Sequence, residues 1–184
     1  MDAKSKIIAI TEAVIMNYIQ QNYSTKDNID EEIKRIKNIF EAIDVSFANI
    51  IPGVPTRATN HGNGKITLRF DDINNISEEE MSDTIETLIH EYYHSISKRE
   101  KGNIFLEEGY VTYITAETVR FGIDNPIDVG DVSKEELKEL LQRQNLINGY
   151  HESSEIVRSM QLVMEQYGVD SKYEYIFNGI NLLK

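Results

Sequence analysis

The sequence predicts a mostly helical α+β domain that contains a small mixed sheet. Apolar residues recur at helical spacing near the N-terminus and again over residues 29–43, whereas residues 45–50 and 65–70 alternate between apolar and polar as half-buried strands do. A further helix is expected over residues 77–98, and it carries the segment HEYYH. With 184 residues and no linker or internal repeat, the chain is expected to form one domain, 1–184.

The composition limits the kinds of partner and site. The chain has no cysteine, which excludes disulfides, thiol nucleophiles and cysteine-based metal sites, so histidine and carboxylate are the strong zinc ligands that remain. The formal net charge of −12 argues against nucleic acid and against anionic membranes, because both bind clustered lysine and arginine. We therefore expect neither partner.

The N-terminal segment is expected to be an amphipathic helix and not a signal peptide. Ile7, Val14, Ile15 and Tyr18 fall on one helical face, Glu12 interrupts the apolar run, and no small-residue cleavage site follows. No stretch approaches transmembrane length. A cytoplasmic location is the expectation, and secretion of a chain trimmed of its leader is compatible with the same pattern.

The strand over residues 65–70 is expected to have one buried face and one polar, charged face. Such a polar face is typical of an edge strand, and an edge strand can bind an extended peptide through backbone hydrogen bonds. An ordinary small sheet is an equally good interpretation. On the first interpretation, Gly64, Lys65 and Thr67 are candidate substrate-binding residues. His61, in the turn before the strand, is expected to face solvent.

The helix that carries HEYYH is expected to begin near Ser77, because Ser77 and Glu80 have the spacing of a capping box. An apolar stripe would anchor this helix in the core: Met81, Ile85, Leu88, Tyr92 and Ile96. The stripe leaves out both histidines of HEYYH. We therefore expect His90 and His94 to lie on a different face that lines a cleft.

His90 and His94 are four residues apart, so on a helix both imidazoles can point at one metal ion. Glu91 flanks the same face. Two neutral imidazoles with a carboxylate beside them are what a zinc hydrolase needs, because the carboxylate can take a proton from a water molecule. The alternative is an acidic helical binding domain in which the HExxH pattern is accidental.

A catalytic zinc site usually has three protein ligands, and the third is expected soon after the second histidine. The helix expected from residue 104 carries Glu107 and Glu108 in its first turn. Neighbours on a helix diverge by about 100°, so only one of the two is expected to reach the metal. We choose Glu108, because Gly109 beside it would let the two helices approach closely. Glu107 is expected to be solvated.

These residues resemble the gluzincins, the zinc metallopeptidases in which HExxH is followed by a glutamate on a second helix. The stretch Glu-Gly-Tyr-Val-Thr-Tyr, residues 108–113, looks like the Glu-Gly-Phe-Ala-Ser-Tyr segment of the gluzincin aminopeptidases. The resemblance implies a zincin-like fold with an upper subdomain (about 1–98) and a helical lower subdomain (about 99–184). It also implies Zn2+ held by His90, His94 and Glu108, with Glu91 as the catalytic base.

Residues 149–168 resemble the gluzincin helix whose leading tyrosine stabilises the transition state, and Tyr150 is at the matching position. His151 is the alternative, because some gluzincins use a histidine for this task. The sequence departs from the pattern at Thr112, where many gluzincins have an aspartate that supports a ligand histidine.

The exopeptidase motif of the aminopeptidases is absent ahead of HEYYH. The resemblance therefore implies a zinc-dependent endopeptidase of narrow specificity that acts on a peptide or protein. The alternative function is a catalytically silent zinc-binding regulatory or interaction protein with the same fold.

Three more helices are expected after these motifs. Ser133 and Glu136 have the spacing of another capping box. A helix over residues 151–167 has an expected core stripe: Ile156, Val157, Met160, Val163, Met164 and Tyr167. A last packed helix is expected from Lys172, with these residues inward: Tyr173, Ile176, Phe177, Ile180 and Leu183.

Overall fold

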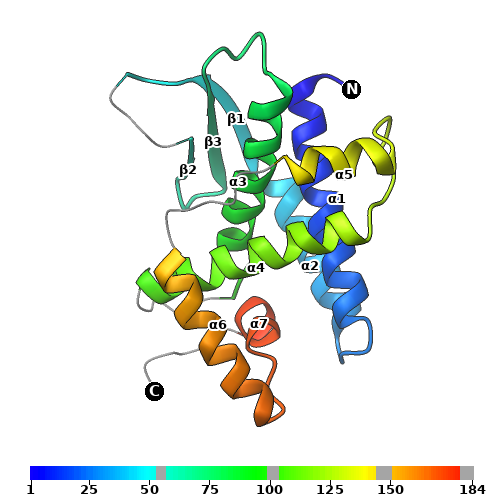
Figure 1. Cartoon of the computed structure of the whole chain (residues 1–184), viewed down its shortest axis with the longest axis vertical. Coiled ribbons are helices and arrows are strands. Elements are labelled where there is room, and N and C mark those ends of the chain that lie inside the picture. The colour runs from blue at the N-terminus through cyan, green and yellow to red at the C-terminus, as the bar shows by residue number, and fades with distance from the viewer. Residues whose placement is uncertain (53–56, 99–103, 144–150, 179–184) are drawn as a thin grey trace.

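The structure of the chain is a computed structural model that describes residues 1–52, 57–98, 104–143 and 151–178. Its elements are α1 (Ala3–Tyr23), α2 (Ile29–Ala42), β1 (Asp44–Asn49), β2 (Ala58–Asn60), β3 (Lys65–Phe70), α3 (Glu78–Ile96), α4 (Ile104–Asp124), α5 (Lys134–Gln142), α6 (His151–Gln166), α7 (Ser171–Tyr173) and the π-helix η2 (Glu174–Asn178). The expected mostly helical class with a small mixed sheet is confirmed (Figure 1).

The sheet has three strands in the order β1-β3-β2, with β1 parallel and β2 antiparallel to β3. The expectation that residues 65–70 form an edge strand is therefore wrong. As expected, the apolar residues of β3 are buried. Alternation of apolar and polar residues along a strand shows which face is exposed to solvent, but it does not show whether the strand has neighbours on one side or on both. The edges are β1 and β2.

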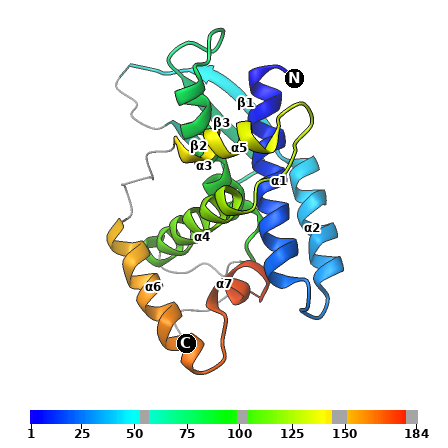
Figure 2. The same cartoon turned by 45° about the vertical axis from the view of Figure 1, so that its right-hand side comes forward.

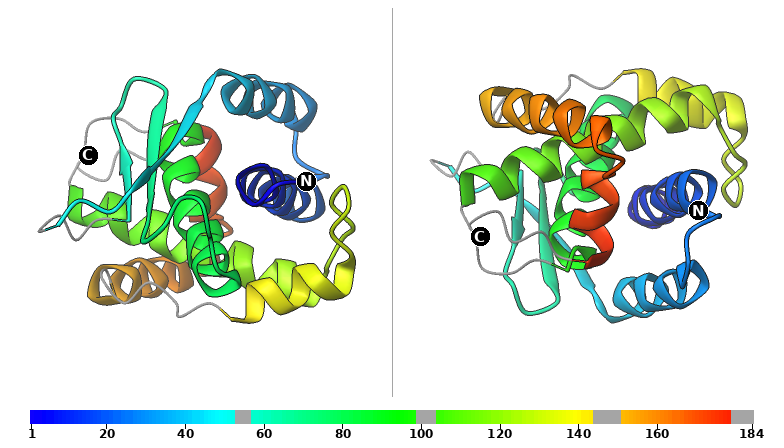
Figure 3. Two further views of the ribbon diagram at one scale, coloured as in Figure 1. Left: turned by 90° about the horizontal axis from the view of Figure 1, so that it is seen from above. Right: turned by 90° about the horizontal axis from the view of Figure 1, so that it is seen from below.

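The expected N-terminal helix is confirmed as α1, but it lies at the centre of the helical packing and is buried or half-buried along most of its length, so the expected amphipathic character is wrong. Ile7, Val14 and Ile15 are buried, and α1 packs against α2, α3 and α4. Figure 3 shows α1 end-on between α2 and α5, and Figure 2 shows α1 and α2 side by side. One hydrophobic core contains residues from both expected subdomains. No helix in the described ranges is long and apolar enough to cross a membrane.

Helix α3 begins at the expected capping box, with Ser77 as its N-cap. The expected stripe faces the core, since Ile85, Leu88 and Tyr92 have no exposed surface. The ring of Tyr92 stacks on Phe40 of α2, with the ring centroids 4.8 Å apart. These contacts fix the rotation of α3 about its own axis, and with it the direction of the remaining faces.

Arg35 of α2 holds the C-terminal end of α3. Its Nη1 donates a hydrogen bond of 2.8 Å to the carbonyl of Ile96, and its Nε donates to the carboxylate of Glu32 at 2.6 Å. Glu32 also pairs with Lys98. The last carbonyls of a helix have no donor within the helix, so the guanidinium satisfies one of them. The backbone is thereby fixed just after His94.

The expected core stripe of α6 is wrong in part. Val157 is buried, but three members of the stripe are exposed: Ile156 (46%), Val163 (55%) and Tyr167 (81%). Gln161 occupies the buried side, where its side-chain oxygen accepts a hydrogen bond from the hydroxyl of Ser171 at the start of α7. Apolar residues occur on more than one face of α6, so the packing of α4 and α7 decides which face is covered.

The expected last helix corresponds to α7 and η2. Ile176 and Phe177 are buried as expected. Ile180 and Leu183 lie outside the described residues.

Glu12 provides a test of how α3 is anchored. Its carboxylate accepts a hydrogen bond of 3.2 Å from the hydroxyl of Tyr92. Burial raises the pKa of the Glu12 carboxyl above its ordinary 4.5, against the opposite effect of that hydrogen bond. The folded protein therefore binds this proton more tightly than the unfolded chain does. It follows that stability is lost as the pH rises through the folded-state pKa.

We expect Glu12→Gln, which keeps the acceptor oxygen and removes the charge, to resist urea better than the wild type at about pH 7.5. Most of the gain should be lost near pH 4, where Glu12 is largely protonated in both the folded and the unfolded chain. Urea unfolding followed by circular dichroism measures the difference, with the exposed Glu31→Gln as the matched control. A gain of equal size at both pH values would contradict the explanation by burial.

Candidate metal centre

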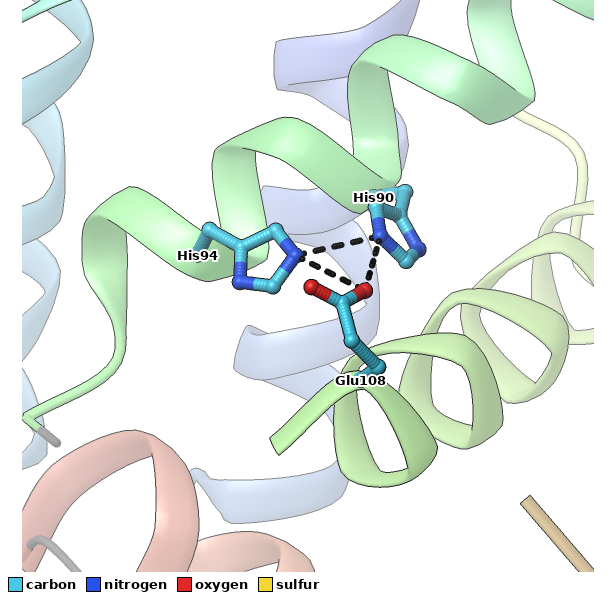
Figure 4. Close-up of side chains that lie close together, drawn as sticks. All are labelled: His90, His94 and Glu108. Carbon is cyan, nitrogen blue, oxygen red and sulfur yellow. Dashed lines mark hydrogen bonds and ion pairs between the residues drawn. The ribbon is translucent and has the colours of Figure 1, made fainter. Parts of the chain in front are cut away.

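Two helices supply the three side chains that could hold a metal ion. His90 and His94 lie one turn apart on α3, and Glu108 lies in the first turns of α4 (Figure 4). Their ligand atoms all lie within 4.8 Å of one another. The site is largely buried, since the side chains of His90, His94 and Glu108 are 8%, 9% and 18% exposed.

The three ligand atoms form a nearly equilateral triangle. Nε2 of His90 lies 3.1 Å from Nε2 of His94 and 3.2 Å from Oε2 of Glu108, and Nε2 of His94 lies 3.4 Å from the same oxygen. Ligand atoms at about 2.0–2.1 Å from a tetrahedral zinc ion are about 3.3 Å apart. The triangle therefore has the size of one face of such a tetrahedron, and the residues fit a metal ion.

The Glu108 carboxyl is held in its ionised form. Burial on its own would raise its pKa, but the hydrogen bonds and charges of the two imidazoles outweigh burial and lower the pKa to about 2. A carboxylate must be deprotonated to bind a cation. Glu108 meets this condition at neutral pH.

Glu107 contradicts the expectation of a solvated side chain. Its Oε1 lies 3.2 Å from Nδ1 of His94, and its side chain is only 16% exposed. Because neighbouring positions on a helix diverge by about 100°, Glu108 lies near Nε2 of His94 and Glu107 lies near Nδ1 of the same ring. A hydrogen bond from Nδ1 to a carboxylate keeps the proton on Nδ1 and leaves the Nε2 lone pair for a metal.

The sequence contained a signal for this contact. Glu107 and Glu108 are adjacent in one turn, and an imidazole has two nitrogens that need partners. Sequence reasoning considered only the metal as a target for a carboxylate and so overlooked the ring nitrogen on the far side.

The Glu91 carboxyl lies within electrostatic range of all three candidate ligands. Burial raises its pKa, the charges of His90 and His94 act in the opposite direction, and the charge of Glu108 adds to the rise. The backbone carbonyl of Glu91 accepts a hydrogen bond of 3.2 Å from Nδ2 of Asn60. The structure thus brings Glu91 beside the candidate ligands and connects it to the end of β2.

The three candidate substrate-binding residues have different surroundings. Gly64 lies in the β2–β3 turn at φ +77° and lines a cavity that His94 also lines. The hydroxyl of Thr67 lies 3.0 Å from Nε2 of the exposed His61, and the carbonyl of Lys65 accepts a hydrogen bond from the His61 backbone. Because β3 is the central strand, the argument for peptide contacts at Lys65 and Thr67 no longer holds.

Tyr150 lies outside the described residues, and so does the side chain of His151, so their catalytic role stays a prediction. Thr112 stands on α4 one turn after Glu108. Its hydroxyl is buried and makes no hydrogen bond with any described residue. The carboxylate that supports a histidine is instead Glu107, and it supports His94.

No protein-family model matches the chain, and comparisons with curated proteins and with solved structures gave no match.

We expect the protein to bind one divalent cation per chain at this site, with Zn2+ as the probe. A ligand that binds only the folded state stabilises it by about 2.7 kcal/mol at one hundred times its dissociation constant, so Zn2+ should raise the unfolding temperature. His94→Ala should abolish this rise. His61→Ala, which removes an exposed histidine, is the matched control and should retain it. Stabilisation by Zn2+ that survives in His94→Ala would contradict the assignment.

Glu107→Ala should weaken Zn2+ binding by about 10- to 100-fold, because the ring of His94 loses the carboxylate that orients it. Glu107→Gln keeps an oxygen that can accept from Nδ1 and should lose less. Competition with a chromogenic chelator measures both affinities. Glu135→Ala, in the first turn of α5, serves as the control. Wild-type affinity in Glu107→Ala would show that the contact has no role in metal binding.

Proposed function

We propose that the protein is a zinc-dependent peptidase with a zincin-like fold of the gluzincin type. The observation that carries the proposal is the triangle of ligand atoms from His90, His94 and Glu108, with the Glu91 carboxyl beside it. Two imidazoles and one carboxylate are a donor set of catalytic zinc sites, in which one position stays free for water. Calcium and magnesium favour sites built from oxygen ligands, so the two imidazoles favour zinc.

Each residue of the site has a distinct task in the proposed reaction. Zinc in such a site supplies a Lewis acid that makes a water molecule acidic near neutral pH. Glu91 accepts the proton of the attacking water and returns it to the leaving amine. The burial that raises the pKa of Glu91 suits this task, because a proton carrier works best when its pKa lies near the operating pH. Tyr150, with His151 as the alternative, donates a hydrogen bond to the oxyanion.

The strand that would bind an extended substrate in this proposal is β2, which is an edge of the sheet. Residues 57 and 61 are hydrogen-bonded to β3, so in an antiparallel pair the backbone groups of Ala58 and Asn60 point away from it. Asn60 also donates to the carbonyl of Glu91. An extended peptide paired with β2 would therefore run next to the helix that carries Glu91. The absence of an exopeptidase motif favours cleavage of internal bonds.

One observation favours a second candidate function. The side chains of His90 and His94 are only 8% and 9% exposed, which is the burial expected of a structural metal site. In this alternative the protein binds zinc without turnover and acts as a regulatory or interaction protein.

Glu91→Gln separates the two candidates. We expect it to lower cleavage of a diverse peptide library by about 10²- to 10⁴-fold, because the proton acceptor is lost. Its zinc content should stay at the wild-type level, since Glu91 is not a ligand. Glu79→Gln, an exposed residue in the first turn of the same helix, should cleave like the wild type. Equal cleavage by Glu91→Gln would rule out this base, and zinc binding without any cleavage by the wild type would support the silent protein.

A further inference from the structure

Asn60, the last residue of β2, joins this edge strand to the helix that carries Glu91. Its Nδ2 donates a hydrogen bond of 3.2 Å to the backbone carbonyl of Glu91 and one of 3.0 Å to the hydroxyl of Ser95. Its Oδ1 accepts a hydrogen bond of 2.9 Å from the backbone N–H of Gly62. One side chain thus holds the β2–β3 turn in shape and ties it to the turn of α3 that begins at Glu91.

A second connection between β2 and α3 is weaker. Arg57, which precedes β2, lies 3.6 Å from the carboxylate of Glu80 in the first turn of α3, and its side chain is 47% exposed. Exposed ion pairs of this kind contribute little to stability. Asn60 is half-buried and lines the cavity that His94 also lines. Of the two connections, the one through Asn60 is therefore the stronger and the nearer to the candidate metal centre.

The backbone of β2 is available to a substrate while the amide of Asn60 holds the strand. The N–H and C=O groups of Ala58 and Asn60 point away from β3. A peptide that extends the sheet at β2 would pair with these groups through two of its own N–H groups, two residues apart. Asn60 would then contact the substrate through its backbone and the helix of Glu91 through its side chain.

We propose that Asn60 is a positioning residue of the peptidase, whose side chain fixes a substrate bound along β2 relative to Glu91 and the metal. This inference rests on the proposed function. Reacting atoms must lie about 3–3.5 Å apart, and a misplacement of about 1 Å can lower a rate about 100-fold. Pairing along β2 holds the peptide on the strand, and the amide of Asn60 holds the strand on the helix that carries the base.

Asn60→Ala should lower kcat for a peptide that the wild type cleaves by about 10- to 100-fold, because alignment is lost. KM should stay within about threefold, because the backbone groups that bind the peptide remain. Asn60→Asp keeps the oxygen that accepts from Gly62 and loses the donor to Glu91, so its kcat should fall in the same range. Asn63→Asp adds the same charge at an exposed position of the same turn and should match the wild type.

Backbone N-methylation of the peptide, one residue at a time, tests the pairing with β2. It should raise KM about tenfold at two positions that are two residues apart, because each N-methyl group removes one hydrogen bond to the strand. The same two positions should respond in the wild type and in Asn60→Ala, since the side chain of Asn60 takes no part in this pairing.

Zinc affinity and the circular dichroism spectrum are measured for every variant and should equal those of the wild type. Wild-type kcat in Asn60→Ala or in Asn60→Asp would overturn the positioning role and leave the peptidase standing. A fall in kcat matched by loss of zinc or of helical signal would do the same, and so would a KM that no N-methyl group changes. A wild-type protein that binds zinc and cleaves no peptide would overturn the proposed function together with this inference.

Discussion

The burial of one face of α3 fixes the direction of the two histidines. Ile85, Leu88 and Tyr92 have no exposed surface, and burying a large apolar side chain contributes about 1.5–3 kcal/mol. Turning the helix far enough to move His90 away from α4 would expose at least two of these side chains, at a cost of about 3–6 kcal/mol. The core therefore holds both imidazoles towards the first turns of α4, where Glu108 meets them.

Glu91 and Glu108 are the same kind of side chain in one small volume, yet their pKa values move in opposite directions. At Glu108 the interactions with the two imidazoles outweigh burial and hold the pKa of the carboxyl at about 2. Burial dominates at Glu91, and the charge of Glu108 adds to the rise. Environments that separate the pKa values of two neighbouring carboxyls suit them to different tasks. Glu108 is suited to bind a cation, and Glu91 to exchange a proton.

Local patterns predicted most elements and the three candidate metal ligands, because caps and helical spacing are encoded within a few turns. They failed where distant segments decide the outcome. The central place of β3 depends on pairing with β1 and β2, and the burial of Gln161 depends on Ser171, which α7 brings to it. The role of Glu107 was missed for another reason. Helix geometry correctly predicts that Glu107 and Glu108 point in different directions. It does not predict that the Glu107 carboxylate lies beside the second ring nitrogen of His94.

His94 belongs both to the candidate metal centre and to the lining of the cavity beside it. Its Nε2 faces His90 and Glu108, its Nδ1 faces Glu107, and the residue also lines the adjacent cavity. A planar ring that contacts partners through both nitrogens has little freedom to turn, so the carboxylate that orients the ring for a metal also sets the shape of the cavity wall. The hydrogen bond from Arg35 to the carbonyl of Ile96 limits movement of the backbone just after His94.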